Sequence, residues 1–109
     1  MTESRALSDE AADPPTRPGA VVRVIRIVNE KGLHARASAK FVQTVEKFDA
    51  DVRVTRGHET VGGTSIMGLM MLAAGPGTTI TVSVSGPEAD AALAAICELV
   101  ESKFNEEAT

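Results

Sequence analysis

A histidine and an arginine two residues apart form the most reactive arrangement in this sequence. Both lie in residues 32–38, GLHARAS, between a strand-like segment and a helical one. His34 would therefore stand at the start of a helix, where unpaired backbone N–H groups carry about half a positive elementary charge. This field disfavours the imidazolium ion, so we expect His34 to stay neutral and nucleophilic. The first-turn N–H groups, that of Ala35 among them, could bind a phosphoryl group on the ring, and the planar Arg36 guanidinium could contact its oxygens.

The same residues also have a purely structural interpretation. A histidine before a helix is often only the polar end of a loop, and Arg36 is compatible with ordinary solvated surface. A metal site has less support, because His58 is best explained as a turn residue and Cys97 belongs to a different helix. Catalytic triads, paired carboxylates and Gly-rich nucleotide loops are not recognisable, so no cofactor is expected. The local chemistry alone leaves a functional and a structural His34 about equally supported.

A second segment, residues 65–72 (SIMGLMML), is unusually apolar for a short helix. Six of its eight residues are large and apolar, more than such a helix can bury beneath itself. Methionine is flexible and is common on surfaces that accept several partners, although any single methionine is more often a core residue. We therefore expect one or two of these side chains to face outward. Ser65 is placed to cap the helix N-terminus, and an N-cap serine can also accept a phosphate.

The elements that must position these segments follow from hydrophobic periodicity. Ile80, Val82 and Val84 alternate with polar residues, as in a half-buried strand, whereas residues 38–48 repeat apolar side chains on one helical face. The last helix is expected to be capped by Ser85 or Gly86, with Pro87 in its first turn. The predicted elements are strands at 21–28, 51–56, 59–61 and 78–85, and helices at 35–48, 66–72 and from 87 to 104. Helices covering one face of a single sheet make an α+β two-layer fold.

Composition narrows the possible functions. The 109 residues carry a net charge of −4 and only three aromatic side chains, all Phe, which argues against nucleic-acid binding. One cysteine cannot form an internal disulfide, and neither a membrane span nor a signal peptide is recognisable, so we expect a cytoplasmic domain. Residues 1–20 are acidic and contain three prolines, which predicts a flexible tail. Residues 21–109 form the expected folded domain.

Together, GLHARAS and SIMGLMML resemble the HPr family, the histidine-containing phosphocarriers of the bacterial phosphoenolpyruvate-dependent phosphotransferase system. The resemblance covers residues 21–104. It implies an open-faced β-sandwich, in which three helices cover one face of a four-stranded antiparallel sheet. It also implies a carrier rather than an enzyme: His34 accepts a phosphoryl group on Nδ1 from phospho-enzyme I and passes it to an EIIA-type protein.

The resemblance assigns roles to other positions as well. Arg36 matches the active-centre arginine that contacts the phosphoryl group, and Ser65 matches the serine modified by HPr kinase/phosphorylase in lineages that have that enzyme. Met67, Leu69 and Met70 match the surface on which partners dock. The expected partners are therefore proteins, with no nucleic acid or membrane, and the expected state is a monomer.

This sequence departs from the family pattern at two positions. Ala37 replaces the usual proline after the arginine, which leaves an extra backbone N–H near the phosphate, and Thr64 stands where many members carry a basic residue. The sequence of residues 32–50 and 62–77 is similar to that of the alphaproteobacterial branch. Members of this branch often act in a regulatory phosphorelay rather than in sugar uptake.

A hypothesis of a different class remains open on the residues. The chain could be a non-catalytic α+β module that binds a ligand or acts as a regulatory scaffold, with His34 purely structural. Phosphorylation by enzyme I and phosphoenolpyruvate distinguishes the two, since a scaffold would take up no label.

Overall fold

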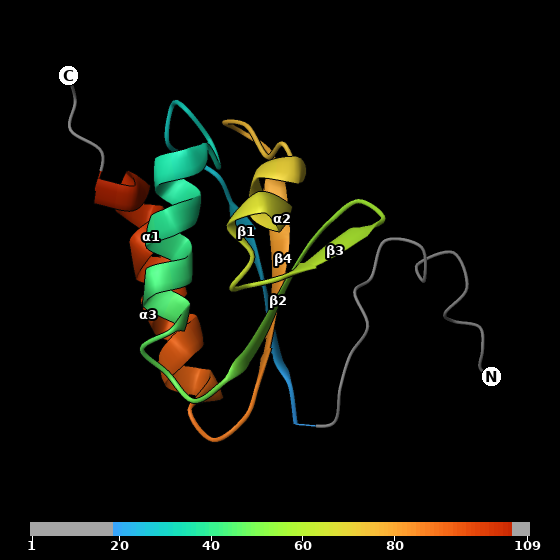
Figure 1. Cartoon of the computed structure of the whole chain (residues 1–109), viewed down its shortest axis with the longest axis vertical. Coiled ribbons are helices and arrows are strands. Elements are labelled where there is room, and N and C mark those ends of the chain that lie inside the picture. The colour runs from blue at the N-terminus through green and yellow to red at the C-terminus, as the bar shows by residue number, and fades with distance from the viewer. Residues whose placement is uncertain (1–18, 106–109) are drawn as a thin grey trace.

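The computed structural model describes residues 19–105. Strands and helices are interspersed along the chain (Figure 1). In order they are β1 (Val21–Arg26), α1 (Ala35–Val45), β2 (Asp51–Arg56), β3 (Glu59–Gly62), α2 (Ile66–Met71), β4 (Thr79–Ser85), α3 (Ala89–Glu101) and a short helical turn, η2 (Lys103–Asn105). The predicted tail at 1–20 lies outside the described residues, apart from Gly19 and Ala20. Within the described part of the chain, no helix is long and apolar enough to cross a membrane.

The four strands form one antiparallel sheet in the order β1-β4-β2-β3. All three α-helices lie on the same face of this sheet (Figure 1). The register pairs Ile25 with Ile80 and places Val54 opposite Val82, so the apolar side chains of neighbouring strands form rows on the helix-covered face. This arrangement confirms the predicted α+β fold and its strand–helix order.

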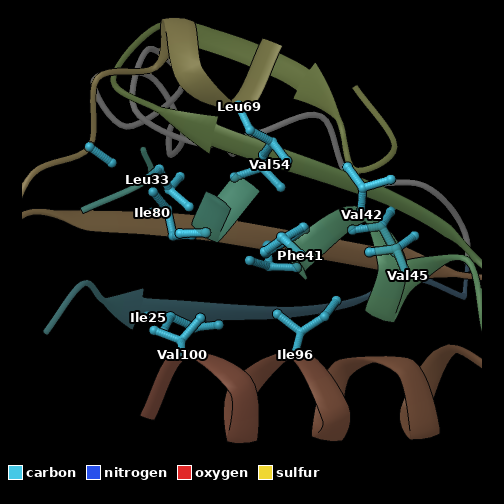
Figure 2. Close-up of a cluster of buried hydrophobic side chains, with 14 of the residues drawn as sticks. Ile25, Leu33, Phe41, Val42, Val45, Val54, Leu69, Ile80, Ile96 and Val100 are labelled. Atoms are coloured by element: carbon cyan, nitrogen blue, oxygen red, sulfur yellow. The ribbon is translucent and has the colours of Figure 1, made fainter. Parts of the chain in front are cut away.

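The core lies between the sheet and the helices (Figure 2). Phe41 of α1 and Ile96 of α3 are both fully buried in this layer. The predicted apolar face of α1 is confirmed, with Ser38, Phe41, Val42 and Val45 all buried. Helix α1 ends at Val45, three residues before the predicted end, because the backbone tightens there into a turn.

The predicted start of the last helix is wrong. Pro87 precedes the helix, and the N-cap position is Glu88, whose side chain makes no capping hydrogen bond. The Glu88 carboxylate instead accepts a hydrogen bond from the Asp49 backbone N–H at 2.7 Å, and the Glu88 N–H donates to the Asp49 carbonyl at 3.1 Å. Contacts with the α1–β2 connection therefore set this helix start, and no short-range motif encodes them.

The C-terminal end of the described chain is an unusual left-handed turn. Lys103, Phe104 and Asn105 all have φ near +60°, at 60°, 57° and 56°. Phe104 is nevertheless fully buried, and its carbonyl accepts a hydrogen bond from Lys40 Nζ at 2.7 Å. The left-handed backbone costs roughly 1–2 kcal/mol per residue, and burial of the phenyl ring, which contributes about 1.5–3 kcal/mol, offsets part of that cost.

Candidate functional site

The loop that carries His34 is fixed against the segment that follows α2. Gly32 has φ +62°, and a Cβ at this position would lie 2.3 Å from the Ala74 carbonyl oxygen, so only glycine fits. The next residue, Leu33, donates its N–H to that same oxygen at 3.0 Å. Asn29 is fully buried and donates from Nδ2 to the Gly32 carbonyl at 2.9 Å. Asn29 therefore helps to shape the loop.

His34 is the N-cap of α1, as its position in the sequence predicted. Its backbone is extended, with φ −77° and ψ −176°, and its carbonyl accepts the Ser38 N–H at 2.8 Å to begin the helix. Its ring nitrogen Nδ1 accepts a hydrogen bond from the backbone N–H of Ala37 at 3.1 Å. A nitrogen that accepts a hydrogen bond carries no proton, so the neutral ring holds its proton on Nε2. The Nδ1 lone pair therefore points at the positive end of the helix.

Ala35 and Arg36 form the start of α1, next to the ring. Both side chains are exposed, whereas the His34 side chain is half-buried. The backbone N–H groups of the first turn have no acceptor within the helix, because the residues four positions earlier lie outside it. An anion next to Nδ1 would be stabilised by these N–H donors and by the positive end of the helix dipole. The exposed Arg36 guanidinium is free to approach such an anion from solvent.

Ser65 is the N-cap of α2, which confirms the sequence prediction. Its hydroxyl oxygen accepts the Gly68 N–H at 2.9 Å, and its carbonyl accepts the Leu69 N–H at 2.9 Å. A Cβ on residue 68 would lie 2.9 Å from this hydroxyl and equally close to Val61, so glycine at 68 makes room for the cap. The Ser65 side chain is exposed, which leaves its hydroxyl open to modification.

Helix α2 exposes more apolar surface than the sequence suggested. Four large side chains, which together we call the α2 patch, are exposed: Ile66 at 40%, Met67 at 70%, Met70 at 39% and Met71 at 70%. Leu69 does not belong to this patch. It is fully buried and reaches from α2 toward Val54 of the sheet (Figure 2), so its placement on the docking surface is wrong. Leu69 instead anchors the helix that presents the methionines.

The His34 loop and α2 lie at the same end of the molecule. Helices α1 and α2 are in contact, and Figure 1 shows α2 beside the N-terminal half of α1. Arg56 fixes the far end of α2, because its Nη1 donates to the Leu72 carbonyl at 3.0 Å. The sequence offered no sign of this contact. The α2 patch is thus held next to the start of α1, which creates one surface that contains both features.

The other residues considered from the sequence lie elsewhere. His58 is exposed in the β2–β3 turn, as predicted, and Cys97 is a free, partly buried thiol on α3. Among residues 19–105, no group of three His, Cys, Asp or Glu side chains is close enough to hold a metal ion. The chemistry of the described site therefore rests on one imidazole, one guanidinium and a helix N-terminus.

Comparison of the sequence with known proteins finds a matching family. The family model of the PTS HPr component phosphorylation site matches residues 21–102. The phosphocarrier protein NPr of Shewanella violacea is 45% identical over 84 residues, which cover 77% of this chain and 92% of the relative. The phosphocarrier protein HPr of Neisseria meningitidis is 48% identical over 82 residues, covering 75% of this chain and 92% of the relative.

Solved structures of such proteins share the fold. The crystal structure of HPr-C-His from Thermoanaerobacter tengcongensis superimposes with a TM-score of 0.76 at 40% identity, covering 80% of this chain and 98% of that one. HPr from Bacillus anthracis gives a TM-score of 0.71 at 38% identity, covering 74% and 96%. The chain therefore belongs to the HPr family of the phosphotransferase system, whose members are phosphocarrier proteins with a histidine phosphorylation site.

Proposed function

We propose that His34 is the phosphoryl acceptor and that Nδ1 is the reacting atom. Family membership implies enzyme I as the donor and an EIIA-type protein as the acceptor. In the transfer, the Nδ1 lone pair forms the new N–P bond, while the bond between phosphorus and the donor atom breaks and its electron pair returns to the donor. The observation that carries this assignment is the position of Nδ1 over the N-terminus of α1, 3.1 Å from a backbone N–H.

The start of α1 provides the charge that a phosphohistidine needs. Phosphoryl transfer asks a protein mainly for positioning and for stabilisation of negative charge. The N–H groups of Ala35 and Arg36 point out of the helix start, and the Arg36 guanidinium adds a permanent, planar cation. We assign these two residues the role of holding the phosphoryl oxygens. Arg36 is exposed, so it can also reach a group that is shared with a partner protein.

The α2 patch is the proposed docking surface for both partners. It is apolar, it lies beside the start of α1, and three of its four side chains are methionines, which adapt their shape to different surfaces. A carrier must engage a donor and an acceptor in turn, so an adaptable surface beside the reacting atom suits the task. We propose that the free carrier is a monomer, because this patch must be open to each partner.

Ser65 is the proposed site of regulation by HPr kinase/phosphorylase. Its exposed hydroxyl stands at the N-terminus of the helix that presents the α2 patch. A phosphate would add a charge of about −1.5 to −2 at the edge of that patch. The added charge would weaken docking of partners, through repulsion of acidic groups and through the desolvation it requires.

The physiological role that we propose is a cytoplasmic regulatory relay of the alphaproteobacterial type. The support comes from the amino-acid sequence of residues 32–50 and 62–77, which is similar to the sequences of that branch. We assign the carrier function to residues 21–109.

Labelling with enzyme I tests the proposed acceptor. Incubation with enzyme I and labelled phosphoenolpyruvate should give the wild type a label that is lost in acid and stable in base. His34→Ala should take up no label. His58→Ala is the matched control, because His58 is the chain's other histidine and is exposed in a turn away from α1, so it should be labelled like the wild type. An unlabelled wild type would instead support the scaffold hypothesis.

A further inference from the structure

The hydrogen bond between Ala37 and His34 engages the atom that must react. Nδ1 has a single lone pair in the plane of the ring, and the Ala37 N–H points at it from 3.1 Å. The N–P bond would use this same lone pair. A phosphorus atom therefore cannot approach Nδ1 while the hydrogen bond is made, and the two states exclude one another.

The donor in this bond is held in place, so the ring must be the part that moves. Ala37 is fully buried, and it lies in the first turn of α1, whose helical hydrogen bonds begin with the His34 carbonyl and the Ser38 N–H. The His34 side chain is only half-buried, so rotation about its Cα–Cβ bond can carry the ring toward solvent. We call the hydrogen-bonded arrangement the closed conformation and the rotated one the open conformation.

We propose that the backbone N–H of Ala37 is a positioning group that holds the acceptor nitrogen closed in the resting carrier. Phosphorylation then proceeds only from the open conformation. This inference rests on the proposed role of His34 and adds a step before the transfer. A proline at 37 would have no N–H, so the nature of this one residue decides whether the closed conformation exists.

The size of the effect follows from the strength of one hydrogen bond. The net stabilisation that such a bond provides corresponds to about a 2- to 10-fold ratio between the closed and open conformations. The apparent rate of a step that uses only a minor conformation is reduced by the fraction of molecules in that conformation. Removal of the N–H should therefore raise kcat/KM for phosphorylation by about 2- to 10-fold.

The first measurement observes the bond directly in the wild type, without any variant. In protein labelled with ¹⁵N, a scalar coupling across the hydrogen bond should connect the Ala37 amide nitrogen to His34 Nδ1. The ¹⁵N shifts of the ring should show Nδ1 unprotonated and Nε2 protonated. The coupling should disappear on phosphorylation. Absence of the coupling, or a proton on Nδ1 of the neutral ring, would overturn the proposal even if every variant failed to fold.

The second measurement is kinetic and compares Ala37→Pro with Ala37→Gly. Proline is tolerated in the first turn of a helix, and glycine keeps the N–H, so only the proline variant loses the bond. Phosphorylation by phospho-enzyme I should be about 2- to 10-fold faster for the proline variant than for the glycine variant. Equal or slower phosphorylation, with α1 intact by NMR, would refute the proposal.

A wild type that shows the coupling but takes up no label would refute the acceptor role of His34, and a labelled wild type without the coupling would refute only the closed conformation.

Discussion

Gly32→Ala should destabilise the fold and disturb the site through one identified contact. The added Cβ would lie 2.3 Å from the Ala74 carbonyl oxygen and 2.8 Å from the Gly75 Cα, and both atoms are backbone. The loop must therefore move away from the segment after α2. That movement breaks the hydrogen bond from the Leu33 N–H to the Ala74 carbonyl, which is 3.0 Å long in the wild type.

The expected loss of stability has two parts. A left-handed conformation costs a residue with a Cβ roughly 1–2 kcal/mol. The lost hydrogen bond and the displaced loop add about 1–2 kcal/mol, because the buried Asn29 side chain donates to the Gly32 carbonyl and depends on the loop's position. The free energy of unfolding should fall by about 2–4 kcal/mol. For a domain of this size, Tm would drop by about 10–25 °C.

Gly57→Ala separates the two parts. Gly57 has nearly the same φ, +64°, but a Cβ there would meet nothing within 4 Å. This variant therefore carries only the conformational cost, roughly 1–2 kcal/mol. Thermal and urea unfolding of both variants measures the difference. Equal melting temperatures would refute the claim that contact with Ala74 makes glycine necessary at position 32.

The same pair of variants tests whether the loop positions the reacting atom. The His34 N–H donates to the Gly32 carbonyl at 2.9 Å, so a shifted loop carries His34 with it. A displacement of about 1 Å can cost 10²-fold in rate, so Gly32→Ala should be phosphorylated about 10- to 100-fold more slowly at a temperature where it is folded. Gly57→Ala should be phosphorylated at the wild-type rate.

Three further outcomes are expected. Arg36→Ala should slow phosphoryl transfer by at least about tenfold in labelling kinetics, with an unchanged Tm because the side chain is exposed; a wild-type rate would remove Arg36 from the mechanism. Ser65→Ala should no longer accept the acid-stable phosphate that HPr kinase adds from ATP. Its free energy of unfolding in urea should fall by about 1 kcal/mol, because α2 loses its cap, whereas Ser65→Asp should keep the wild-type stability. Phe104→Ala should lose about 3–5 kcal/mol in the same urea assay, and a loss below about 1 kcal/mol would show that the left-handed turn does not anchor the core.

Strong periodicity made most of the fold predictable from the sequence. The alternation of Ile80, Val82 and Val84 placed three side chains on the covered face of β4, and all three are buried. The helical face of α1 was equally clear, because its polar residues occupy the other side. Both helix starts at the proposed sites were also predictable, since His34 and Ser65 are polar residues directly before apolar helices.

The errors occurred where local pattern and tertiary contact differ. Leu69 could not be told apart from the methionines around it, because α2 is apolar on every side and has no polar face to set its orientation. The start of α3 depends on Glu88 and Asp49, which are far apart in the sequence. Phe104 continues the apolar spacing of α3, yet it is buried from a left-handed turn beyond the helix end.

The strand order also determines when a newly made chain can become a carrier. Strands β1 and β2 do not pair with each other, since β4 lies between them and bonds to both. While the ribosome is still making residues before 79, the only pairing available is the β2–β3 hairpin, and an isolated hairpin is marginally stable in water. The His34 loop likewise lacks its contact with the segment after α2 until Ala74 has been made. Release of β4 from the exit tunnel completes the sheet, so a chain truncated before Ala74 would carry the proposed acceptor His34 with neither the finished sheet nor the contact that holds its loop.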